Sequence, residues 1–94
     1  MTDTNYKENQ PATKIDLLPP YSEDWKSGYL NINSEGRRTL ALYNSPSDRS
    51  STQYARYILA VSLGRYLTDN EEADHIDGDK TNDDIKNIQI LKNI

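Results

Sequence analysis

Alternating apolar and polar residues in the middle of the chain predict a β-hairpin. Residues 28–32 read Gly-Tyr-Leu-Asn-Ile, and residues 33–36 are the Asn, Ser, Glu and Gly of a turn. Residues 37–43 are then expected to return antiparallel. Leu40 and Leu42 would share one face of that strand, because successive side chains alternate between the two faces.

A helical period follows a loop at residues 44–48. Apolar side chains recur at the i, i+3, i+4 and i+7 positions of one stripe, namely Tyr54, Tyr57, Ile58 and Val61. We interpret this stripe as core rather than as a surface for stacking bases. Ser50 or Ser51 is expected to begin the helix, because Ser50 and Gln53 have the spacing of a capping box. Gly64 is expected to end it in a left-handed conformation.

Two further strands are expected near the C-terminal end of the sequence. They span residues 72–76 and roughly 88–91, and the polar residues 77–84 form a long loop after the first of them. Apolar side chains of this region are expected to anchor it in the core: Ile85, Ile88, and either Ile90 or Leu91.

The N-terminal segment has a different composition. Residues 1–20 are polar and hold three of the four prolines, which is typical of a flexible or extended arm. The chain is therefore divided into an arm over residues 1–24 and a folded domain over residues 25–94. Because the 94 residues are only 34% hydrophobic and include no Phe, the core is expected to be small. The expected fold class is α+β.

The composition also excludes several classes of protein. Without cysteine the sequence has neither a disulfide framework nor a thiolate zinc site. No apolar run approaches the roughly 20 residues of a membrane span, and no signal-peptide pattern begins the chain. A cytoplasmic protein without membrane contact is the expectation.

Charge is unevenly distributed along the chain. Residues 25–66 carry six Lys or Arg against two acidic residues, whereas residues 67–94 carry three Lys against eight acidic residues. A phosphate-binding face beside a cation site would have this distribution, and so would ordinary scatter of surface charge. Arg56 and Arg65 lie outside the apolar stripe of the helix and are expected to face solvent.

The acidic end holds the main candidate for chemistry. It contains the only histidine of the protein within the run Asp74-His75-Ile76-Asp77-Gly78-Asp79-Lys80-Thr81-Asn82. Such loops are commonly no more than solvated turns. A calcium loop counted from Asp77 fails, because its sixth position is Asn82 rather than Gly and its twelfth is Ile88 rather than Glu. A helical zinc pair is excluded by the single histidine.

This run, continued by Lys86-Asn87-Ile88-Gln89-Ile90-Leu91, resembles the signature of the HNH endonuclease family, specifically its phage and intron homing members. The signature consists of a carboxylate or His, a His, an apolar residue, Asp-Gly, a polar run with Asn, and a later Asn before an apolar residue. Residues 63–67 also look like the end of the helix that precedes it in such proteins. The resemblance covers roughly residues 28–94.

The resemblance implies a ββα-metal finger and a metal-dependent DNA endonuclease. Asp74 would be a ligand of one divalent cation, Mg²⁺ or Mn²⁺, and His75 would be the general base that activates water. Asn87 would brace the loop and orient the imidazole, while Asp77 and Asn82 would stabilise the loop. Phosphates of double-stranded DNA would contact basic side chains, for which the candidates are Arg56, Arg65, Lys80 and Lys86.

One part of the family pattern lies beyond the printed sequence. A third residue, His or Asn on the last helix, would fall near position 96, whereas the sequence ends at Ile94. We therefore expect a finger truncated before its final helix, a weakly held cation, and an apolar face that a second chain could complete. Three functions remain open: a DNA endonuclease or the N-terminal part of one, an inactive HNH-derived module that binds DNA or a protein partner, and binding of a basic protein surface by the acidic face of residues 67–94.

Overall fold

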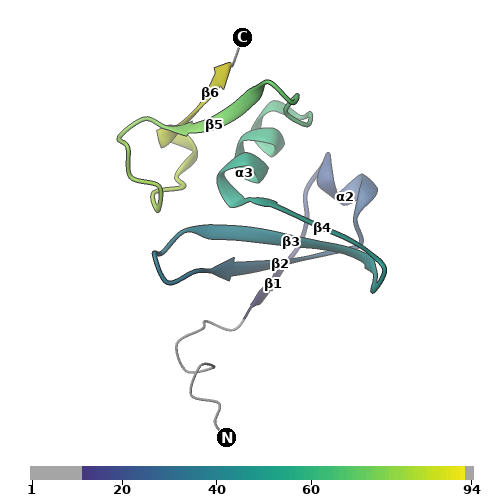
Figure 1. Ribbon diagram of the computed structural model, residues 1–94. Coiled ribbons are helices and arrows are strands. Elements are labelled where there is room, and N and C mark those ends of the chain that lie inside the picture. Colours follow the sequence, from purple (N-terminus) through teal and green to yellow (C-terminus); the bar gives the residue numbers. More distant parts are fainter. Residues whose placement is uncertain (1–11, 93–94) are drawn as a thin grey trace, which may run out of the picture.

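The computed structural model describes residues 12–92. They form an α+β fold in which helix α3 lies between a four-stranded and a two-stranded antiparallel sheet, as expected for the fold class (Figure 1). The elements, in chain order, are β1 (Thr13–Ile15), α2 (Tyr21–Asp24), β2 (Ser27–Ile32), β3 (Arg38–Ser45), β4 (Asp48–Gln53), α3 (Tyr54–Leu63), β5 (Glu71–His75), the 3₁₀ turn η1 (Ile85–Asn87) and β6 (Ile88–Lys92).

The expected hairpin is formed by β2 and β3, at the centre of the larger sheet. Leu30 pairs with Leu40, and the side chains of Leu40 and Leu42 are buried on the face that α3 covers. The turn depends on Asn33, whose Oδ1 accepts hydrogen bonds from the backbone N–H groups of Glu35 and Arg37. Gly36 completes the turn at φ 82°, a backbone conformation that glycine adopts without strain.

The expected start of the helix is wrong. Residues 48–53 form strand β4, in which Ser50 pairs with Leu42 of β3, and helix α3 begins only at Tyr54. Gln53 occupies the N-cap position without a capping hydrogen bond from its side chain, so the capping box does not form. The backbone groups of 48–53 find partners along β3 instead, and this pairing satisfies more of them than a single cap would.

Helix α3 contributes to two hydrophobic clusters. The first contains the expected stripe, because Tyr57 and Ala60 are buried against Leu40 and Leu42 while Tyr54, Ile58 and Val61 pack around them. The second was not anticipated and contains Ala55 and Leu59 of the helix with Leu67 and Ile88. Gly64 ends the helix at φ 75°, and its N–H donates to the carbonyls of Ala60 and Val61, as expected for a left-handed stop.

Residues 13–24 are not an arm. Strand β1 pairs with β2, and Tyr21 of α2 is buried with its ring centroid 5.1 Å from that of Tyr57. The approach is close at Gly28, where a Cβ would lie 2.6 Å from Leu17 Cδ2. The boundary expected at residue 24 therefore fails because the apolar side chains before it enter the core, whereas residues 1–11 lie outside the described part.

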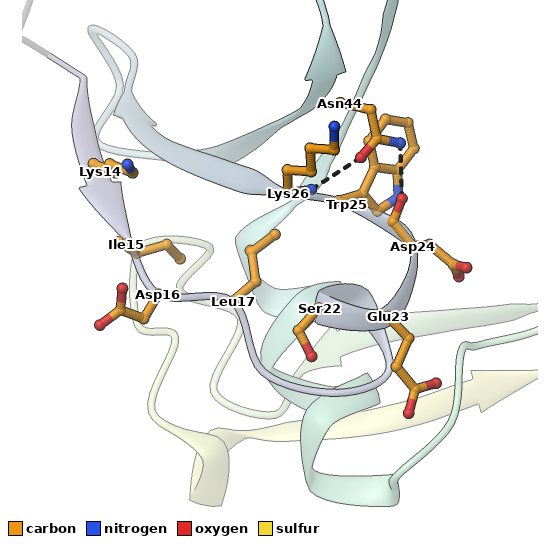
Figure 2. A pocket seen from close by; sticks show the side chains of 10 residues that line it. All are labelled: Lys14, Ile15, Asp16, Leu17, Ser22, Glu23, Asp24, Trp25, Lys26 and Asn44. Carbon is orange, nitrogen blue, oxygen red and sulfur yellow. Dashed lines mark hydrogen bonds between the residues drawn. The ribbon is translucent and has the colours of Figure 1, made fainter.

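Asn44 of β3 connects α2 to the larger sheet. Its Nδ2 donates to the carbonyl of Asp24 at 2.8 Å, and its Oδ1 accepts from the N–H of Lys26 at 3.0 Å (Figure 2). These residues, together with residues 14–17, line a cavity of about 560 Å³. The side-chain amide thus satisfies two backbone groups at the point where α2 passes into β2.

The expected C-terminal strands are β5 and β6, which pair antiparallel with His75 opposite Ile88. Ile88 is buried, and Ile90 packs beside it on the second cluster. Ile85 is 40% exposed and Leu91 is 48% exposed, so the expectation that Ile85 anchors the core is wrong. Ile88 and Ile90 share the strand face toward α3, whereas Leu91 is on the opposite face and Ile85 lies in the preceding turn.

Candidate functional site

His75 is the last residue of β5 and contacts a carboxylate that the sequence did not single out. Its Nε2 lies 2.7 Å from Asp83 Oδ1, and its side chain is 13% exposed. An ionised carboxylate can only accept a hydrogen bond, so this contact assigns the proton to Nε2. In the neutral imidazole, Nδ1 is then the nitrogen with a free lone pair, and it can take a proton.

Asp83 in turn contacts a residue of the larger sheet. Its side chain is 5% exposed, and its Oδ2 lies 3.4 Å from Nη1 of Arg38, the first residue of β3. The same nitrogen donates to the backbone carbonyl of Thr81 at 3.1 Å. Arg38 thereby joins the loop after β5 to the β2–β3 hairpin, across 43 positions of sequence. Local sequence patterns carry no signal for such a contact.

The loop between β5 and β6 is braced by the side chain of Asn87. Its Nδ2 donates to Asp77 Oδ1 at 2.9 Å and to the carbonyl of Asn82 at 3.0 Å, while its Oδ1 accepts from the N–H of Asp77. Asn82 Nδ2 also donates to Asp77. Of the several hydrogen bonds that lower the pKa of the Asp77 carboxyl, this one has the largest effect. The backbone carbonyl of Asn87 accepts from the N–H of Ile76, directly after His75.

The side chain of Asp74 has a different hydrogen-bond partner from that of His75. Its Oδ2 accepts a hydrogen bond from Gln89 Nε2 at 2.9 Å across the β5–β6 pair. Alternation along the strand puts the side chains of Asp74 and His75 on opposite faces of β5. Both residues nevertheless line one cavity of about 290 Å³, whose wall also includes the carboxylate residue Glu72 as well as Arg37, Lys80 and Gly78.

The described residues do not by themselves complete a cation site. Among residues 12–92, no three His, Cys, Asp or Glu side chains come together in a way that could hold a metal ion. Asp74 offers one carboxylate, and one of its oxygens is already hydrogen-bonded to Gln89. A divalent cation needs six or more oxygen ligands in all, so most of them would have to come from elsewhere.

Arg56 and Arg65 stabilise the fold and have few free donors. The guanidinium of Arg56 is half-buried and donates to the backbone carbonyls of Leu67, Thr68 and Glu71, so the expectation that it faces solvent is wrong. Arg65 is 49% exposed, but it donates to both carboxylate oxygens of Glu71, at 2.9 and 3.1 Å. Carbonyl and carboxylate oxygens that are buried near the start of β5 need hydrogen-bond donors, and the two arginine side chains supply them.

Other cations are nearer to the cavity. Lys80 is exposed and lines it, as does the half-buried Arg37, which the sequence did not single out. Lys86 is exposed on η1, beyond the lining residues. Arg37 follows the β2–β3 turn directly, and only the packing of the β5–β6 loop against that turn brings it to His75.

No helix among the described residues is long and apolar enough to cross a membrane. No protein-family model, curated protein or solved structure matches this chain. The resemblance to the HNH endonucleases stays a prediction from the motif residues between Asp74 and Leu91.

Proposed function

We propose that this chain is a divalent-metal-dependent DNA endonuclease of the HNH type, or the N-terminal part of one, in which His75 is the general base. One observation carries the proposal: an imidazole held by a buried carboxylate at 2.7 Å is part of the wall of a cavity that Lys80 and Arg37 also line. A base oriented by an acid, next to cations, is an arrangement suited to hydrolysis of a phosphodiester.

The reaction requires one proton transfer at His75. Nδ1 takes a proton from water as its oxygen attacks phosphorus, and the bond between phosphorus and the 3′ oxygen breaks. The products are a 5′-phosphate and a 3′-hydroxyl, whose proton comes from solvent. Asp83 keeps the ring oriented and stabilises the imidazolium that forms, while Lys80 and Arg37 offset the negative charge that builds on the phosphate.

In this proposal β5 and β6, which the loop connects, are the two strands of a ββα-metal finger. Asp74 would contribute one ligand to Mg²⁺ or Mn²⁺, and the other ligands would come from water, the DNA phosphate or a second chain. The cation would supply a Lewis acid at the phosphate.

A non-catalytic module that binds DNA or a protein partner is the second candidate. It is favoured by the finding that no three metal-ligating side chains meet within residues 12–92. The two candidates differ in one measurable property, because only the endonuclease breaks phosphodiester bonds.

The test is nicking of supercoiled plasmid by the full chain with Mg²⁺ or Mn²⁺, and with EDTA as the metal-free arm. His75→Ala should lower the nicking rate by about 100-fold or more, the usual contribution of a general base. Asp83→Asn should lower it less, because the imidazole keeps its place but loses its charged partner. Lys92→Gln, an exposed change in β6, is the matched control. Nicking that survives His75→Ala would falsify the assignment of His75 as the general base. Binding of the plasmid by the chain without nicking would support the non-catalytic module.

A further inference from the structure

One face of the larger sheet is covered by α3, and the other points away from the helix (Figure 1). Alternation along β2 and β3 turns Leu40 and Leu42 toward the helix, and it turns Tyr29 and Tyr43 to the other side. The two rings meet edge to face, with centroids 5.6 Å apart and an interplanar angle of 79°. Both side chains are half-buried, so part of each ring is accessible to solvent.

A cavity of about 580 Å³ lies over this face. Both tyrosines line it with Asn31, Pro46 and Arg49, and no Asp or Glu is among its lining residues. Its volume is within the range of sites that hold small organic groups. The aliphatic side chains of the lining are limited to alanine and proline, so an apolar peptide anchor would find little to pack against.

Each tyrosine has a cation as its partner on the neighbouring strand. Arg49 of β4 pairs with Tyr43, and Lys14 of β1 pairs with Tyr29. Among the positions of β1 to β4 that pair in regular register across this face there is no acidic residue. Asp48 borders the face beyond the bulge, where it pairs with Ser45, and its carboxylate accepts a hydrogen bond from Asn44 Nδ2. The two adjoining rings thus have one cation on each outer side, at a cross-strand distance of about 5 Å, so surfaces on which bases can stack lie between groups that can contact phosphates.

We propose that this face, defined by Tyr29, Tyr43, Asn31, Arg49 and Lys14, binds single-stranded nucleic acid. Unpaired bases stack on the two tyrosine rings, Arg49 and Lys14 contact the phosphates, and the amide of Asn31 hydrogen-bonds to a base edge. An unpaired strand is favoured over a duplex because the faces of paired bases are already covered by their neighbours. The inference goes beyond the proposed function, because this face and the His75 cavity share no lining residue and binding to this face requires no cutting.

The test is fluorescence anisotropy of a labelled oligothymidylate of about 12 nucleotides, a length that one small sheet domain can cover, against a duplex of the same length. Tyr29→Leu and Tyr43→Leu should each weaken binding roughly 5- to 100-fold, because stacking on the flat ring is lost. Tyr29→Phe and Tyr43→Phe keep the ring and should bind like the parent. Arg49→Gln should lower the slope of log affinity against log salt by about 0.7.

Three controls separate the possible outcomes. Circular dichroism and thermal unfolding establish that the variants fold, and Lys92→Gln on the other sheet should leave binding unchanged. His75→Ala should also bind normally, so loss of cutting and loss of binding are distinguished. Equal binding by the leucine variants, or tighter binding of the duplex, overturns the proposal. So does sedimentation of the free protein as a dimer that Tyr43→Leu dissociates, since a second copy would then cover the face.

Discussion

At the scale of single residues, the contact between Glu71 and Arg65 joins a buried carboxylate to both terminal nitrogens of a guanidinium. The carboxylate is buried, accepts two hydrogen bonds from the guanidinium, and accepts a third from the N–H of Thr68. Hydrogen bonding to Arg65 is the main reason that the pKa of Glu71 falls from 4.5 to about 2. The pair joins the end of α3 to the start of β5, so it fixes the position of the chain on one side of the second hydrophobic cluster.

Stability should therefore depend on pH through Glu71. The folded state has the lower pKa, so the stabilisation is complete above pH 4.5 and is lost as the pH falls toward 2. Glu71→Gln should lower the unfolding midpoint at neutral pH, and the difference from the parent should shrink across that interval. Thermal unfolding of both proteins from neutral to acid pH measures this, with Glu35→Gln in the exposed turn as control. A difference that stays constant with pH would contradict the role given to the ion pair.

At the scale of elements, helix α3 has core on two sides. Tyr57 and Ala60 pack on the larger sheet, whereas Ala55 and Leu59 pack toward the smaller one. The strand β4 leads directly into the helix, and Gly64 ends it. Because both sheets depend on the helix, the point at which it ends controls where Leu67 and β5 can lie.

The helix end offers a clean test of backbone conformation. At Gly64 an added Cβ would meet no atom within 4 Å, so Gly64→Ala introduces no steric clash and its main destabilising effect is the cost of holding φ at 75°. The variant should lose about 1 kcal/mol of unfolding free energy. Ser62→Ala, an exposed change on the same helix, should differ from the parent by less than about 0.5 kcal/mol. Urea denaturation of the three proteins measures their unfolding free energies. An unchanged unfolding free energy in Gly64→Ala would show that the backbone at the helix end relaxes to accommodate the alanine.

At the scale of the whole molecule, the two sheets are joined by α3 and by the contact of the β5–β6 loop with the β2–β3 hairpin. Arg38 is central to this contact, since it donates to Thr81 and pairs with Asp83. Thr81 also lies against the turn, where its Cγ2 would be 3.2 Å from a Cβ on Gly36. The orientation of His75 thus depends on a residue of the other sheet.

Removing that contact should loosen the loop before it affects the fold. In Arg38→Gln, hydrogen exchange should quicken at the amides of residues 81–84, while the amides of β2 and β3 keep their protection. Arg37→Gln removes a neighbouring cation that has no hydrogen bond to the loop among the described contacts, and it serves as the control. Unchanged exchange at residues 81–84 would show that Asn87 and Asp77 hold the loop without Arg38.

The sequence by itself determined the features that depend on neighbouring residues. Alternation and turn residues located β2, β3, β5 and β6, the apolar period located the first stripe of α3, and Gly64 located its end. Each of these signals acts within a few positions of the chain. They include the motif from Asp74 to Asn87 that suggests nuclease chemistry, since it is a pattern of residue types at short spacing.

Only the tertiary structure decided which side chains meet. It turned the apparent helix start at Ser50 into strand β4, because β3 offered a full set of backbone partners. It brought Asp83 into contact with His75, and Arg38 into contact with Asp83. It also placed Arg65 beside Glu71. A buried carboxylate must find a donor wherever the packing brings one, and no local pattern specifies that choice.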